Sequence, residues 1–130
     1  MTENYQNAPI DVGGMRPDPD QPLSGLWDWD IAHGGLEWSP EIYRLFGVEP
    51  AAFDASYPAF LEMVHPDDRD KVSAAVRAAL EDGQPYQVDH RILTRSGDIR
   101  SVREMGKVER DAAGKPIRML GIVQDMGGRL

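Results

Sequence analysis

Apolar and polar residues alternate with a period of two near the end of the chain, and this pattern predicts three β-strands. The strands span about residues 86–94, 99–109 and 117–125. The connecting residues 95–98 and 111–116 are rich in Gly, Asp and Ser, which favour tight turns. Residues 117–125 are nearly all apolar, as is typical of a central, well-covered strand.

Two further strands are predicted before residue 40. In the segment 25–31, Trp27 and Trp29 alternate with acidic residues, so both indoles lie on one face of the strand. A turn at residues 33–35 contains two glycines, and residues 36–38 return as a short second strand.

A long amphipathic helix is predicted over residues 67–82, and Gly83 ends it. Its apolar residues recur at helical spacing and are Val72, Ala75, Val76, Ala79 and Leu80. The sequence before it, His65-Pro66-Asp67-Asp68-Arg69, is typical of a helix start. We expect the ring or backbone of His65 to satisfy exposed N–H groups of the first turn.

Shorter helices are predicted between the second strand and the long helix. Ser39 is a suitable N-cap for a helix that begins at Pro40 and ends at Gly47. A single turn near residues 50–53 and a short helix at about 58–63 follow. The element order β-β-α-α-α-α-β-β-β predicts an α+β fold.

Composition limits the classes of function. The 130 residues suffice for one domain, and the chain contains no cysteine, which excludes disulfides and thiolate chemistry. The net charge of -8 argues against nucleic-acid binding. There is no secretion signal and no apolar run of the roughly 20 residues that cross a bilayer, so a cytoplasmic location without membrane contact is expected.

Charge is unevenly distributed along the chain, since residues 90–130 hold nine of the 14 Lys and Arg residues. This distribution is consistent with a solvated, arginine-bearing sheet face, or with a dipolar molecule whose ends dock on each other or on a partner. Residues 1–23 contain four prolines and show no apolar period, which predicts a flexible N-terminal leader.

The chain resembles a PAS domain of the PAS-3 type, found in bacterial sensor proteins, over residues 24–126, with 127–130 left as a tail. The motifs that carry the resemblance are Trp27-Asp28-Trp29-Asp30, Trp38-Ser39-Pro40, Phe46-Gly47, His65-Pro66-Asp67-Asp68-Arg69, His90-Arg91-Ile92, Ser96-Gly97 and Gly121-Ile122-Val123-Gln124-Asp125. Their order and spacing, rather than any single motif, make the resemblance specific.

The resemblance implies a five-stranded antiparallel sheet with short helices and one longer helix on one face, enclosing a cavity. It also implies sensing, dimerisation or adaptor binding rather than catalysis, with a histidine kinase or another signalling protein as partner. Two positions depart from the family pattern. A small Ser101 stands where a large aromatic residue is usual, and the terminal Asp-Ile-Thr element reads Asp125-Met126-Gly127. By resemblance, Asp125 couples the sheet to a following signalling helix. We expect Trp27 and Trp29 on the first strand to take part in signal coupling or in an interface.

The candidate ligand site lies on one face of the last strands. Alternation places Val102, Glu104 and Gly106 on the same face, and His90 on the neighbouring strand faces the same space. Gly106 leaves room for a group to approach the sheet. A buried Glu104 would need a partner such as His90 or an arginine. The alternative is that both side chains lie on the outer face.

Cofactors are restricted by the residues present. The three histidines are far apart in sequence and have no ligand-spaced partners, so no metal site is expected. By resemblance, haem is disfavoured because residues 66–82 contain no histidine. A flavin that forms a cysteine adduct and a thioester-bound chromophore both need a thiol, so composition excludes them. A small metabolite or a non-covalent flavin stacked on Trp27, Trp29 and Trp38 stays open, beside a filled-core dimerisation module without ligand. No catalytic motif is present, and an enzyme is not expected.

Overall fold

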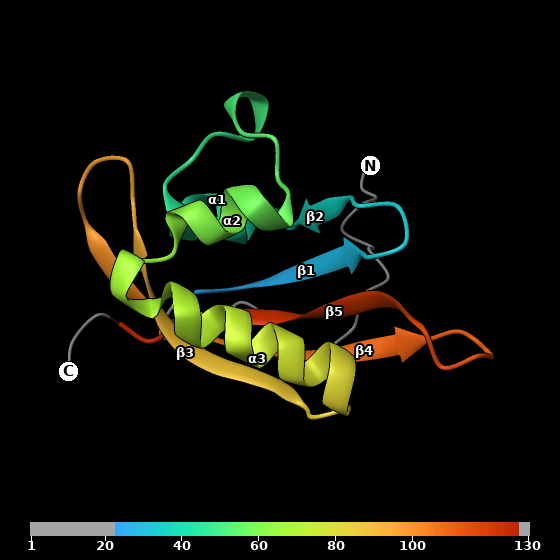
Figure 1. Ribbon diagram of the computed structural model, residues 1–130. Coiled ribbons are helices and arrows are strands. Elements are labelled where there is room, and N and C mark those ends of the chain that lie inside the picture. Colours follow the sequence, from blue (N-terminus) through green and yellow to red (C-terminus); the bar gives the residue numbers. More distant parts are fainter. Residues whose placement is uncertain (1–22, 128–130) are drawn as a thin grey trace.

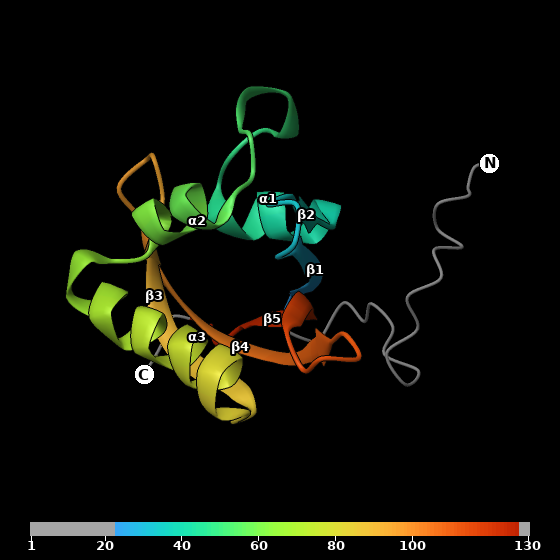
Figure 2. The same ribbon diagram turned by 45° about the vertical axis from the view of Figure 1, so that its right-hand side comes forward.

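The computed structural model describes residues 23–127, which form one antiparallel sheet with helices on a single side (Figures 1 and 2). The strand order across the sheet is β2-β1-β5-β4-β3. The strands are β1 (Ser24–Asp30), β2 (Leu36–Trp38), β3 (Tyr86–Leu93), β4 (Ile99–Arg110) and β5 (Pro116–Asp125). All five predicted strands and the α+β class are therefore confirmed. The expected leader and tail fall almost wholly outside the described residues.

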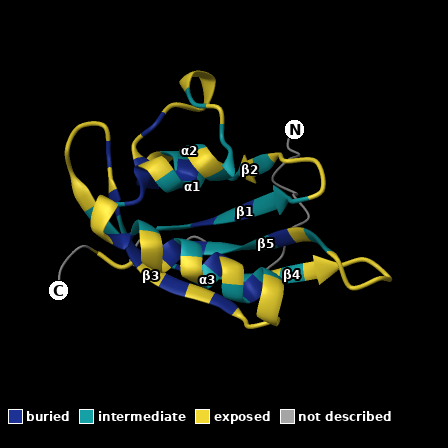
Figure 3. Cartoon of the chain, in the orientation of Figure 1, coloured by how far each residue is buried: buried dark blue, intermediate teal, exposed yellow. Residues whose placement is uncertain are grey.

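Burial follows the predicted alternation most clearly in β3, where every second residue from Tyr86 to Ile92 is buried (Figure 3). β5 is central, as expected, because it pairs with β1 on one side and β4 on the other. Its inner residues Met119 and Val123 are buried. The strand is less well covered than predicted, however, because Leu120 and Ile122 lie on the outer face and stay half-buried, where no helix of the described residues lies.

The helices form two groups over the inner face. The α-helices are α1 (Pro40–Phe46), α2 (Tyr57–Met63) and α3 (Arg69–Asp82), and the 3₁₀ turns are η1 (Pro50–Ala52) and η2 (Pro66–Asp68). Figure 2 shows α1 and α2 beyond one end of the curved sheet and α3 across the other. α1 approaches β1 closely at Gly25, where a Cβ atom would lie 2.4 Å from Ile42 Cγ1.

The helix boundaries agree with the sequence, with two corrections. Gly47 and Gly83 end α1 and α3 with positive φ values of 75° and 71°. Ser39 does not cap α1 through its side chain. Its Oγ accepts a hydrogen bond from the Leu26 N–H at 3.0 Å, and this contact continues the pairing of β1 with β2. The long helix begins at Arg69 rather than 67, because the Pro66 turn is 3₁₀.

The hydrophobic core lies between the sheet and the two helix groups. Its fully buried side chains come from every layer, and the largest are Phe46, Ile42, Leu45, Ile92, Met119, Val64, Val72, Val102 and Val123. Arg100 ties the end of α1 to β4, since its Nη1 donates to the Leu45 carbonyl at 2.5 Å. Within residues 23–127, no helix is long and apolar enough to span a bilayer.

Candidate functional site

Four residues at one level of the sheet form the base of the site. Trp27 on β1 is paired with Gly121 on β5, which is paired with Gly106 on β4, and Gly106 is paired with Tyr86 on β3. The Trp27 ring extends across both glycines, since a Cβ atom on either would lie within 2.7 Å of it. Its edge meets the Tyr86 ring with centroids 5.8 Å apart. The two glycines therefore provide the space that this indole occupies.

A cavity opens between this row and the helices, and we call it the aromatic cavity. Its interior volume is about 40 Å³, and the empty space reaches about 430 Å³ when the mouth, which is open to solvent, is included. Its lining residues are Trp27, Trp29, Leu36, Trp38, Ile42, Phe46, Tyr57, Phe60, Val76, Tyr86, Glu104, Met119 and Val123. They come from the sheet and from all three α-helices. A small molecule fits such a space better than a large cofactor does.

One charged residue, Glu104, belongs to this otherwise aromatic and aliphatic lining. Glu104 Oε2 lies 2.9 Å from His90 Nε2, with the two side chains 5% and 0% exposed. The other ring nitrogen of His90 lies 3.3 Å from the Arg91 carbonyl oxygen, and the Phe60 ring packs edge-on against the imidazole. Burial, and then the negative charge of Glu104, raise the pKa of Tyr86 well above its usual value.

Of the ligand residues predicted from sequence, Glu104 lines the aromatic cavity. His90 is buried behind it as its hydrogen-bond partner. Val102 is fully buried opposite His90 on β4 but does not line the cavity, and neither does Gly106, which the Trp27 ring covers. The sequence left open whether Glu104 and His90 lie on the inner or the outer face of the sheet. In the structure both lie on the inner face and are buried.

The predicted coupling residues lie on the paired strands β1 and β5. Trp27 and Trp29 both line the cavity, and the Trp29 ring stacks on Tyr57 of α2 at 5.1 Å. Asp125 ends β5, where its N–H donates to the Leu23 carbonyl at 2.8 Å and its Oδ1 accepts from the Gly127 N–H. Asp125 is also paired with Val102 on β4. Its backbone thus holds the start of β1 beside the end of β5.

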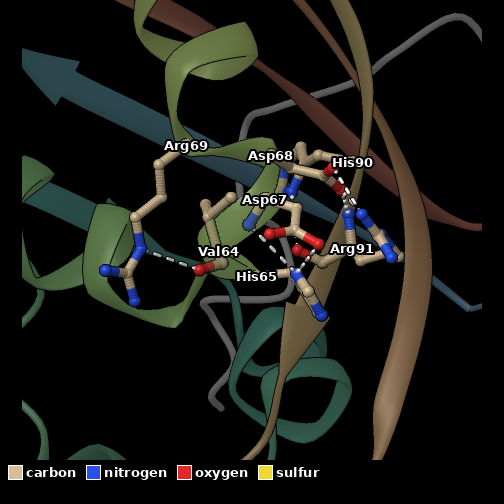
Figure 4. Close-up of polar contacts among 7 residues, drawn as sticks. All are labelled: Val64, His65, Asp67, Asp68, Arg69, His90 and Arg91. Atoms are coloured by element: carbon tan, nitrogen blue, oxygen red, sulfur yellow. Dashed lines mark hydrogen bonds and ion pairs between the residues drawn. The ribbon is translucent and has the colours of Figure 1, made fainter.

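The His65–Arg69 turn connects the helices to the strand that bears His90 (Figure 4). His65 Nδ1 accepts a hydrogen bond from the Asp67 N–H at 3.1 Å, which confirms its predicted role at the helix start. Asp68, at the start of the long helix, also binds a residue of the neighbouring strand β3. Its carboxylate accepts hydrogen bonds from the Arg91 backbone N–H at 2.8 Å and from the Arg91 guanidinium at 2.8 and 3.0 Å.

The side of the cavity formed by α1 and α2 could not be derived from sequence. Phe46, Tyr57 and Phe60 carry a signal, because aromatic residues on amphipathic helices pack inward. That signal does not say which strand residues they face. The bond between Asp68 and Arg91 joins residues 23 positions apart and left no local pattern. Within the described part of the chain, no cluster of three or more His, Cys, Asp or Glu residues could hold a metal ion.

Comparison with known proteins gives consistent matches. The family described as PAS fold matches residues 35–123. The sensor protein FixL of Bradyrhizobium diazoefficiens is 32% identical over 102 residues, which cover 78% of this chain and 20% of FixL. The probable diguanylate cyclase DgcE of Escherichia coli is 26% identical over 102 residues, 78% of this chain and 9% of DgcE. The chain thus spans a fifth or less of the length of these curated relatives.

A solved structure is also similar to this chain in both fold and sequence. The sensory box histidine kinase/response regulator from Burkholderia thailandensis E264 superposes with a TM-score of 0.70 at 37% sequence identity. The match covers 81% of this chain and 78% of that one.

Proposed function

Because the chain belongs to the PAS fold family, a family of sensory domains in signal-transduction proteins, we propose that it senses a small molecule in the aromatic cavity and passes the signal to a protein partner. The observation that carries this proposal is the cavity itself, which is small and apolar and contains a single buried carboxylate. An apolar pocket with one well-placed polar group is the common form of a small-ligand site.

A route from the cavity to the surface supports the signalling part of the proposal. Glu104 bonds His90, and the next residue, Arg91, bonds Asp68 at the start of α3. A ligand that changes the position of Glu104 therefore acts on the strand that α3 is anchored to. Such coupling requires that the ligand bind two states of the domain with different affinities.

The output side of the proposal rests on Asp125, Trp27 and Trp29. The two indoles line the cavity, and β1 is paired with β5 as far as Gln124, next to Asp125. The partner we propose is the output part of a sensor kinase or a related signalling protein in the cytoplasm. A regulatory domain of this kind carries out no reaction itself.

A second candidate function is a dimerisation module without ligand. It is favoured by one row on the outer sheet face, where Leu26, Ile122 and Met105 are paired in register and half-buried. An uncovered apolar row on a sheet face is suited to pairing with another protein surface. Light scattering distinguishes the candidates, since this function requires a dimer that an Ile122→Asp variant loses.

Two matched variants test the ligand proposal. Val76 lines the cavity, whereas Ala74 is exposed on the same helix, so Val76→Phe fills the cavity and Ala74→Phe does not. Native mass spectrometry and thermal-shift screening of small molecules should find a compound that stabilises the wild type and Ala74→Phe but not Val76→Phe. A compound that stabilises all three equally binds elsewhere, and failure of every compound leaves the dimerisation module as the function.

The signalling step is tested at the end of β5. Binding of that compound should shift the amide resonances of Asp125 and Met126, and Asp125→Ala should abolish the effect on the partner while leaving compound affinity unchanged. Unchanged partner regulation in Asp125→Ala would remove this residue from the mechanism.

A further inference from the structure

Trp27 supplies a hydrogen-bond donor that residues 23–127 leave unused. The residue is 8% exposed and lines the aromatic cavity, and its indole Nε1 is a buried polar side-chain atom without a hydrogen-bond partner. Buried donors are nearly always paired, because an unpaired one has given up its bond to water and gained nothing. An acceptor atom presented from the cavity would recover that loss.

Glu104 supplies the complementary acceptor. His90 takes up Oε2, and the described residues provide no hydrogen-bond partner for Oε1. Because Glu104 lines the cavity, a ligand N–H or O–H group can donate to this second oxygen. The site therefore offers the unpaired donor of Trp27 and the second acceptor oxygen of Glu104, in a lining that also includes two other indoles and two tyrosines.

The charges around the cavity favour an uncharged ligand. Among the described residues that line it there is no Lys or Arg, so these residues offer a carboxylate or phosphate no counterion. Glu104 is the acidic residue among the described lining residues, and one of its oxygens is already hydrogen-bonded to the fully buried imidazole of His90. A cationic ligand therefore finds a carboxyl group that already has a partner. A charge moved from water into such an environment without a counterion is strongly disfavoured.

The size and lining of the cavity favour a flat ring. Three indoles and four other aromatic rings surround an interior of about 40 Å³ with an open mouth. Aromatic rings pack well face-to-edge or offset against such walls. A flavin with its phosphate chain has neither the room nor, among the described lining residues, a cationic partner, so the ligand is at most a single ring that enters from the open mouth.

From these observations we infer that the cavity binds an uncharged, single-ring heterocycle that accepts a hydrogen bond from Trp27 Nε1–H and donates one to Glu104. This inference rests on the proposed ligand-sensing function and specifies its ligand class. The two polar contacts give orientation, and the aromatic walls give affinity.

Three rings of similar size test the inference on the full chain at neutral pH. Benzene has neither polar group, pyridine has only the acceptor, and 2-pyridone has both. Affinity should rise in that order, with 2-pyridone about tenfold or more tighter than benzene, which corresponds to one or two neutral hydrogen bonds. The charged rings benzoate and benzylammonium should bind more weakly than benzene.

The indole N–H resonance of Trp27 gives a direct readout in a ¹H–¹⁵N spectrum, and Trp27→Phe identifies it by its disappearance. This proton should move downfield with pyridine and 2-pyridone and much less with benzene. In Trp27→Phe, pyridine should bind no better than benzene. In Glu104→Met, 2-pyridone should lose its advantage over pyridine. If that variant does not fold, N-methyl-2-pyridone, which lacks the donor, makes the same test on the wild type.

The outcomes separate the inference from the function it rests on. Equal affinities for benzene and 2-pyridone, tighter binding of a charged ring, or an unmoved Trp27 proton at saturation would overturn the ligand class and leave the cavity as a binding site. Failure of every ring to bind, together with failure of the thermal-shift screen, would remove ligand sensing as well.

Discussion

At the scale of single residues, two glycines in adjacent strands are explained by one tryptophan. Gly106 and Gly121 lie side by side on the inner face, where other strand positions carry buried side chains. A Cβ atom at Gly106 would lie 2.6 Å from Trp27 Cη2, and one at Gly121 would lie 2.0 Å from the Met105 carbonyl oxygen. Both residues are glycine because an indole and a backbone need the space.

Gly106→Ala should therefore lower the free energy of unfolding by at least about 1 kcal/mol, the usual cost of overpacking a core. Because the closest atoms belong to Trp27, the cost should shrink in a Trp27→Leu background. Gly35→Ala is the control, since nothing lies within 4 Å of its Cβ position. Urea unfolding of the single and double variants measures all three. An equal cost in both backgrounds would show that backbone contacts, not the indole, exclude a side chain at residue 106.

At the scale of elements, the junction between η2 and β3 anchors the long helix to the sheet. The Asp68 carboxylate is buried and bonds both the backbone and the guanidinium of Arg91. The guanidinium hydrogen bond holds the pKa of Asp68 well below its ordinary value of 3.8. A similar pair, Asp89 with Arg103, lies on the solvent side, with side chains 56% and 37% exposed.

Asp68→Asn should lower the free energy of unfolding by about 2 kcal/mol at neutral pH, as expected for loss of charged hydrogen bonds. Asp89→Asn should cost less than about 1 kcal/mol, because exposed ion pairs are screened by water. Urea unfolding at neutral pH compares the two. Similar costs for both variants would contradict a special role of the buried junction.

Ionisation of Asp68 should make the stability of the folded chain depend on pH in a known direction. Since its pKa is lower in the folded chain than in the unfolded one, the folded state binds fewer protons, and this stabilisation is fully present only above the unfolded value. Stability should fall as the pH drops through about 4 towards the lower folded pKa, and the fall should be shallower in Asp68→Asn.

At the scale of the whole molecule, one sheet is shared by two groups of helices, and the cavity lies where their side chains meet. The lining includes Phe46 and Phe60 from one group and Val76 from the other. Neither group covers the inner face alone (Figure 2). The domain should therefore unfold as a single cooperative unit.

Tryptophan fluorescence reports on the β1–β2 and α1–α2 side, whereas far-ultraviolet circular dichroism reports on all elements, α3 included. The two denaturation curves should coincide in urea, with the same midpoint and slope. An earlier fluorescence transition would mean that the cavity side opens while the rest of the sheet stays folded. A ring that binds the cavity should shift both midpoints together.

The sequence was sufficient for much of the fold and for part of the site. Strand periodicity placed Glu104 and His90 on one face, and the alternation in β1 placed Trp27 and Trp29 together. It did not reveal that Trp27 covers Gly106, that Ser39 bonds Leu26, or that Asp68 bonds Arg91. Each of these contacts joins residues that are far apart in the sequence. The pattern of neighbouring residues therefore does not predict which partner each residue has.

What the sequence alone determined is the set of elements and which residues of each share a face, because periodicity, glycine ends and proline starts are properties of neighbouring residues. What only the tertiary structure decided is the register of the five strands and the distance of the helices from them. That arrangement set Trp27 across two glycines, joined the buried side chains of His90 and Glu104, and left a small aromatic cavity between the sheet and the helices. The size and polarity of a cavity depend on how side chains from distant segments fill the same space, which packing settles and local sequence does not.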